Sequence, residues 1–160
     1  MPIPNDALEL EIRSISGEPT LAKAYLILKG AWEQGERDRE LALHLMFIAW
    51  YGIVEPEHIT GFPGDAETKT DLNTTLREVH RALELESQIH DDPEILYAFG
   101  LMAKMFWFVL SEPKFWEKIS IEYRERYREL KPSGLDASIF ADRGAYGAYY
   151  SSQVSIPNGY

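Results

Sequence analysis

The sequence predicts an all-α protein, and three observations support this fold class. Apolar residues recur three or four positions apart along most of the chain, which is the spacing of a helix, and alternation with a period of two is confined to residues 8–15. Good helix formers fill the segments between clusters of proline and glycine. The 160 residues, 45% of them hydrophobic, are enough to form one domain around a core of its own.

Helices of different kinds alternate along the chain. Amphipathic or mixed helices are expected at three places: residues 21–32, 72–89 and 115–130. Residues 41–52 and 95–110 are apolar nearly all round, so each of these helices needs neighbours on every side. A final segment, residues 135–150, combines small and aromatic residues, which let helix axes approach closely while the rings fill gaps.

Prolines and aspartates mark where several of these helices begin. Pro19, Pro93 and Pro113 stand where a proline is tolerated in the first turn of a helix. Asp71 and Asp92 have the short polar side chain that caps a helix N-terminus. We therefore expect helices to start at or next to these positions.

A single domain is expected over residues 1–160. Residues 1–18 form an N-terminal extension with one short strand at 8–15, residues 54–71 an inter-helix loop, and residues 152–160 a C-terminal tail. The apolar segments are shorter than the roughly 20 residues that a bilayer core requires. The first residues lack the basic and apolar regions of a secretion signal, so the expected location is the cytoplasm.

Composition and charge exclude several classes of function. With 26 acidic against 16 basic residues, the formal charge is −10, whereas nucleic acids and anionic membranes select for basic surfaces. The chain has no cysteine, so it has no thiol nucleophile and no cysteine-based metal site. We therefore expect neither nucleic acid nor a membrane as a partner, and no cofactor.

The excess acidity is concentrated in residues 55–94, which hold eleven acidic side chains against three basic ones. Such a field steers the association of a basic partner protein, although a merely solubilising face has the same composition. We expect six residues to contact a partner: Glu84, Glu86, Asp91, Trp107, Tyr146 and Tyr149. Because Phe106, Trp107 and Phe108 are consecutive, they cannot all face the core, and a homodimer through Trp107 and Phe108 is an alternative use of these rings.

Histidine and aspartate suggest a second function. His58, the pair His90-Asp91 and Asp142 follow the order of the metal ligands in HD-domain metal-dependent phosphohydrolases, which are also all-α, and the pattern resembles that family. The resemblance implies a divalent cation that activates water. The same pair, followed by Asp92 and Pro93, fits equally well with a solvated helix junction.

The two other histidines are expected to have structural positions. His44 lies inside an apolar segment, which predicts a core or groove residue with a hydrogen-bond partner. His80 stands between charged residues of a helix and is expected to be exposed.

The sequence at two of the expected helix junctions also resembles that of a known family. Residues 82–85, then 92–94, then the helix through Ala98 and Gly100 are similar to the junction between tetratricopeptide (TPR) repeats, and residues 127–132 followed by 137–146 repeat this pattern. The resemblance implies antiparallel helical hairpins stacked as a right-handed array, with a compact helical bundle as the alternative. In composition the chain resembles bacterial immunity proteins, which implies a non-enzymatic inhibitor or adaptor that binds a basic protein.

Overall fold

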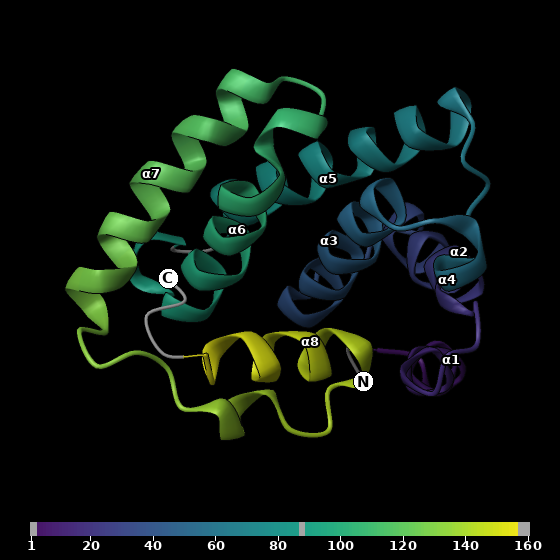
Figure 1. The fold of residues 1–160 in the computed structure, drawn as a ribbon, viewed down its shortest axis with the longest axis horizontal. Helices are drawn as coiled ribbons and strands as arrows, with labels where there is room; N and C mark the ends of the chain where they lie inside the picture. The colour runs from purple at the N-terminus through teal and green to yellow at the C-terminus, as the bar shows by residue number, and fades with distance from the viewer. Residues whose placement is uncertain (1–2, 87–88, 157–160) are drawn as a thin grey trace.

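The computed structural model describes residues 3–86 and 89–156, and this part of the chain is a compact all-α fold without strands (Figure 1). The predicted fold class is confirmed. The elements follow in the order α1 (Asn5–Ile15), α2 (Leu21–Glu33), α3 (Arg39–Val54), α4 (Glu57–Thr60), α5 (Ala66–Glu86), η1 (Ile89–Asp91), α6 (Pro93–Phe106), η2 (Trp107–Val109), α7 (Pro113–Leu130), η3 (Ala137–Phe140) and α8 (Gly144–Val154).

Helix α3 lies at the centre of the fold and is surrounded, as its apolar composition predicts. It packs against α2, α5, α6 and α8, and every residue from Leu41 to Trp50 is buried. Helix α6, the second apolar helix, packs mainly against α7 and also touches α3. The chain then returns to its start, because α8 packs on both α1 and α3 (Figure 1).

The N-terminal segment is a helix, so the expected extension with a strand is wrong. Ala7 and Glu11, four positions apart, are buried on one face of α1, while Ile12 and Ile15 are more than half exposed. This face packs on α2 and α8. The alternation over residues 8–15 predicted a strand wrongly because tertiary packing outweighs a short local pattern. Here α2 and α8 pack against one face of a helix.

The predicted loop at 54–71 also contains helix. It holds the short α4 and the first turns of α5, which begins at Ala66. Asp71 is therefore inside α5 and does not cap it; its carboxylate accepts a hydrogen bond of 3.0 Å from the Tyr25 hydroxyl. The backbone N–H of Thr68 in the first turn is bound instead by Asp65, at 2.7 Å.

The other predicted helix starts are mostly confirmed. The Asp92 carboxylate accepts from the backbone N–H of Ile95, and Pro93 and Pro113 stand in the first turns of α6 and α7. Pro19 lies outside its helix, because α2 begins only at Leu21.

Two predicted helices are interrupted. The helix expected over 95–110 ends at Phe106 and continues as the 3₁₀ turn η2. The helix expected over 135–150 is divided into η3 and α8. Asp142 (φ 58°), between them, and Gly144 (φ 66°), the first residue of α8, have left-handed backbone conformations. Among the described residues, no helix combines the length and the apolar character needed to cross a membrane.

Candidate functional site

Four carboxylates gather where the end of α5, η1 and α7 meet, and we call them the acidic patch: Glu84, Asp91, Glu122 and Glu129. Between 49% and 65% of each side chain is exposed, so all four can meet a partner. Glu84 and Glu122 lie near the buried Tyr123 of α7, and Asp91 and Glu129 both bind Arg126 one turn further along the same helix. Tyr123 itself contacts His80 of α5 and the ring of His90 in η1. The patch therefore joins residues from separate parts of the chain.

His80 is buried beneath the acidic patch, so the expectation that it is exposed is wrong. Its Nε2 lies 2.6 Å from the Tyr123 hydroxyl, and its Nδ1 lies 3.2 Å from Glu84 Oε1 without the geometry of a hydrogen bond. Burial, together with the charge of Arg77, lowers the pKa of His80 to about 3. The ring is therefore neutral near pH 7 and does not compensate the carboxylates above it.

Arg126 holds η1 against α7. Its guanidinium donates to the carbonyl of His90 at 2.7 Å, to Asp91 at 3.0 Å and to Glu129 at 2.9 Å. Lys118 approaches Glu122 at 3.7 Å. Arg126 pairs with two of the four carboxylates and Lys118 with a third, so these six side chains together carry more negative than positive charge.

Only part of the predicted contact set lies on this patch. Glu84 and Asp91 are both there, whereas the side chain of Glu86, the last residue of α5, lies outside the described part of the structure. Trp107 is half-buried in η2 and its ring touches Phe108, with the centroids 5.8 Å apart. Tyr149 is half-buried on α8.

Tyr146 is fully buried, which corrects its expected role as a contact residue. Its hydroxyl donates to Glu94 at 2.6 Å, and burial beside that carboxylate holds the pKa of Tyr146 well above its usual value. The residue faces inward because α8 turns this side toward α3, where the ring packs 5.2 Å from that of His44. It belongs to the core.

Charged residues around Tyr146 form a largely buried network of hydrogen bonds and ion pairs, which we call the buried charge network: Glu11, Arg39, Glu40, His44, Asp92, Glu94 and Arg143. It includes two acidic residues of the stretch 55–94 that we expected at the surface. Glu94 is buried like Tyr146, and its carboxylate accepts a hydrogen bond of 2.7 Å from the Arg143 guanidinium. Asp92 accepts from Arg39 at 2.8 Å through both of its oxygens. The acidic stretch 55–94 is therefore not one continuous surface, since its last carboxylates are paired with arginines of other elements.

His44 lies in the most enclosed part of this network, as a core residue with hydrogen-bond partners. Its Nδ1 is 2.6 Å from Glu11 Oε2 and its Nε2 is 3.3 Å from Glu40 Oε2. Burial alone would lower the pKa of His44, but the bonds to the two glutamates raise it to about 9. The bonds from His44 and Arg143 lower the pKa of Glu40 to about 2, against the effect of burial.

The network is a set of compensated charges inside the fold. Glu11 and His44 have no exposed surface, and each carboxylate in it meets a cation or a backbone N–H. Sequence reasoning missed Glu11 and Arg143. The available signals were the spacing of Glu40 and His44, one helical turn apart, and a glutamate on the buried side of α1.

The four residues of the metal hypothesis lie on different elements. His58 is exposed on α4, His90 and Asp91 belong to η1, and Asp142 is exposed in the turn before α8. Asp91 is paired with Arg126. Over residues 3–86 and 89–156, no group of three or more His, Cys, Asp or Glu side chains is arranged to hold a metal ion.

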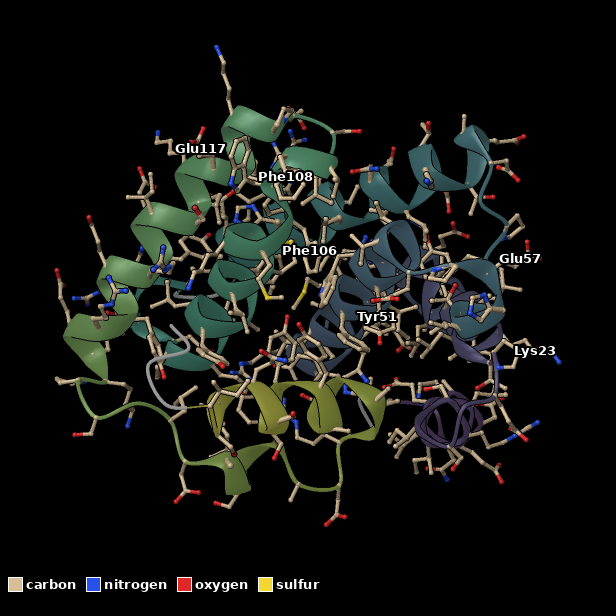
Figure 2. The ribbon with its side chains drawn as sticks, viewed as in Figure 1. Lys23, Tyr51, Glu57, Phe106, Phe108 and Glu117 are labelled. Atoms are coloured by element: carbon tan, nitrogen blue, oxygen red, sulfur yellow. The ribbon has the colours of Figure 1, made fainter. Side chains whose placement is uncertain are left out.

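A second exposed surface is apolar, and we call it the aromatic face. It contains the end of α6, η2 and the half-buried Tyr51 of α3 and Tyr149 of α8, and Figure 2 shows Phe108, Phe106 and Tyr51 one after another across the viewed side. The face rests on the buried Trp50, whose ring lies 4.9 Å from that of Phe106 and 5.2 Å from that of Tyr149. The sequence indicated Tyr149 and the run at 106–108 but not Tyr51, which looks like core in an apolar helix.

Glu122 and Glu129 were also missed, because the charges of α7 are nearly balanced overall. Together with Arg126 they recur at helical spacing and so share one side of α7, which was the available signal.

Comparison of this chain with models of known protein families, with curated proteins and with solved structures finds no match.

Proposed function

We propose that this chain is a non-enzymatic protein-binding module of the cytoplasm, and that its acidic patch docks a basic partner protein. Immunity proteins, inhibitors and adaptors work in this way. The observation that supports the proposal most is that four carboxylates, each about half exposed or more, come from three elements to the neighbourhood of Tyr123 and Arg126.

Rigidity of the patch supports the same function. The hydrogen bond between His80 and Tyr123 and the three bonds of Arg126 hold α5, η1 and α7 in place. A preorganised field of one sign accelerates the encounter with a partner of the opposite sign and loses this effect as salt screens it. The neutral His80 leaves that field undiminished near pH 7.

A matched pair of triple variants tests the proposal. The patch variant is Glu84→Gln/Glu122→Gln/Glu129→Gln, and the control is Glu9→Gln/Glu33→Gln/Glu36→Gln, which removes the same charge from exposed residues of α1, α2 and the segment after α2. Immobilised wild type, patch variant and control are exposed to one lysate, and captured proteins are identified by mass spectrometry. We expect a basic protein that the wild type and control retain and the patch variant loses.

Kinetics with that captured protein complete the test. The association rate measured by interferometry should fall about tenfold in the patch variant at low salt, and the difference should shrink as salt is added. Equal losses in the two triple variants would show that net charge alone acts, and the acidic patch would not be the docking site. Retention of acidic proteins only would also contradict the proposal.

A further inference from the structure

A polar hollow of about 340 Å³ lies between α5 and residues 111–112, which join η2 to α7. The residues that line it are all polar or charged: Thr70, Asn73, Thr74, Arg77, Glu78, Arg81, Ser111 and Glu112. None of these residues belongs to the acidic patch or to the buried charge network. The volume lies at the lower end of the range for small-molecule sites, about 300–1,000 Å³.

Hydrogen-bond donors of α5 form one stripe along the hollow. They follow each other at steps of four, three and four residues, and therefore lie on one side of the helix: Thr70, Thr74, Arg77 and Arg81. The two threonines and Arg81 are exposed, and their side chains have no hydrogen-bond or ion-pair partner among the described residues. The stripe thus presents unused donors, which suit a ligand rich in acceptors.

Arg77 is fixed in place while part of its guanidinium stays unused. Its Nε donates to the Glu112 carboxylate at 2.9 Å, and its guanidinium carbon lies 3.7 Å from the centroid of the Phe115 ring. Within the part of the chain that the structure describes, its two terminal nitrogens have no partner. A guanidinium held along one edge and one face is preorganised, so it loses little conformational freedom when it binds a ligand.

Residues 111–112 form the other wall of the hollow and are held against α5. The backbone N–H of Ser111 donates to Asn73 Oδ1 at 2.9 Å, and the Asn73 side-chain amide donates to the carbonyl of Lys69 at 2.8 Å. Glu112 has a left-handed backbone (φ 60°, ψ 57°) before Pro113, which is uncommon for a residue other than glycine. These contacts fix the two walls relative to one another.

The charges around the hollow leave one guanidinium without a counter-ion. Glu112 is paired with Arg77, and Glu78 lies 3.5 Å from the ammonium of Lys29. Arg81 has no carboxylate within ion-pair distance among the described residues, and it stands one helical turn from Arg77. Like charges at this spacing repel each other. An anion between the two guanidiniums would relieve the repulsion.

From these observations we infer that the hollow binds the phosphate group of a small molecule. Three terminal oxygens of a phosphate match the free N–H groups of Arg77 and Arg81 and the hydroxyl of Thr74. A carboxylate has only two oxygens and would leave some of these donors unused. Glu78 and Glu112 disfavour ligands with further negative charge, such as polyphosphates, and accept hydrogen bonds from hydroxyl groups of the ligand.

Nuclear magnetic resonance of the ¹⁵N-labelled full chain tests the inference. The protein is titrated at constant ionic strength with inorganic phosphate, with glycerol 3-phosphate and, for comparison, with acetate. Both phosphates should shift the backbone amide signals of residues 70–81 and 111–112 in a saturable manner, and acetate should bind more weakly. Equal affinities for the two phosphates would identify the phosphate group alone as the ligand, and tighter binding of glycerol 3-phosphate would identify a phosphomonoester. Either result supports the site.

A matched pair of variants locates the binding. Arg81→Gln should raise the dissociation constant for both phosphates about tenfold, because it removes charge-assisted hydrogen bonds to the ligand. The fold should tolerate this change, since the Arg81 side chain is exposed and has no partner among the described residues. Arg128→Gln is the control: it removes the same charge from an exposed residue of α7 outside the hollow and should leave the dissociation constant unchanged.

Several results would overturn the inference. They are the absence of saturable shifts up to about 10 mM phosphate, equal binding of acetate, signal shifts confined to other residues, and equal effects of the two variants. Docking of a basic protein on the acidic patch involves none of these residues, so this outcome and that of the proposed function are read separately.

Discussion

Two buried histidines of this protein take opposite charge states, although both lie in helices of one core. Two glutamates flank His44 and raise its pKa to about 9. His80 is packed among the rings of Phe99, Phe115 and Trp116, and its pKa falls to about 3. Burial disfavours the charged form of both rings. Hydrogen bonds to two glutamates outweigh this effect at His44, whereas the half-exposed Glu84 lies 3.2 Å from His80 without forming a hydrogen bond and does not.

His44 predicts how stability depends on pH. Its pKa is higher in the folded state than the ordinary 6.5, so its contribution is complete below about pH 6.5 and is lost as pH rises through 9. The shift corresponds to about 3 kcal/mol. We expect His44→Gln to lower the free energy of unfolding by about that amount near neutral pH and to remove this alkaline loss.

Urea unfolding at about pH 6 and at about pH 9.5 measures both effects, with the wild type as the reference. Other groups titrate in the alkaline range, so the quantity to compare is the difference between the two proteins at each pH. Equal differences at the two pH values would mean that His44 is not charged in the folded state.

At the scale of the element, the start of α8 depends on a residue from the other end of the chain. Glu11 of α1 accepts from the backbone N–H groups of Ala145 at 3.1 Å and Tyr146 at 3.4 Å. The first backbone N–H groups of a helix have no acceptor within the helix, so a carboxylate at the N-terminus of α8 satisfies two of them and also complements the positive end of the helix dipole. Gly144, with φ 66°, brings the backbone against that carboxylate.

Gly144→Ala should therefore destabilise the protein. A Cβ at this position would lie 2.6 Å from Glu11 Oε1 and 3.0 Å from a methyl group of Leu8, in a left-handed conformation that alanine disfavours. We expect the free energy of unfolding to fall by about 2 kcal/mol, measured by urea unfolding.

Gly30→Ala is the matched control for this substitution. Gly30 lies inside α2 with nothing within 4 Å of the added Cβ, so alanine should stabilise the protein by about 0.5–1 kcal/mol. Destabilisation by both alanines, or by neither, would contradict the role given to Gly144.

At the scale of the whole molecule, the buried charge network closes the fold. Arg143, in the turn before α8, donates to Glu40 of α3 at 2.8 Å and to Glu94 of α6 at 2.7 Å. Through His44 the same network reaches Glu11 of α1. One guanidinium thus ties the turn before α8 to two central helices, and removing it would take the nearest cation from two largely buried carboxylates, whose remaining contacts with cations would be those of 3.3 Å with His44 and Arg39.

Arg143→Ala should cost about 3–5 kcal/mol, because a buried carboxylate that loses its cation keeps its desolvation penalty. Arg13→Ala is the comparison: its pair with Glu18 is half exposed and should be worth less than about 1 kcal/mol. Thermal and urea unfolding of the two variants measure this contrast. Similar losses for both arginines would show that the network does not support the fold.

Local pattern accounts for much of this architecture. The helical spacing over residues 115–130 and the apolar character of 41–52 predicted α7 and the surrounded helix α3. These predictions succeeded because periodicity and helix propensity act within a few turns of the chain. The strand expected at 8–15 failed because the choice there depends on which face finds a partner, and α2 and α8 provide one only after folding.

The sequence by itself determined the all-α class, the apolar helices that need cover, several helix starts and the acidic character of the surface. Only the tertiary structure decided which charged residues remain outside. It paired Asp92 with Arg39, turned Glu94 and Tyr146 inward, and brought Glu84 and Glu122 near Tyr123. The physical reason is that helix formation is local, whereas burial, pairing and pKa depend on contacts between residues that are distant in the chain.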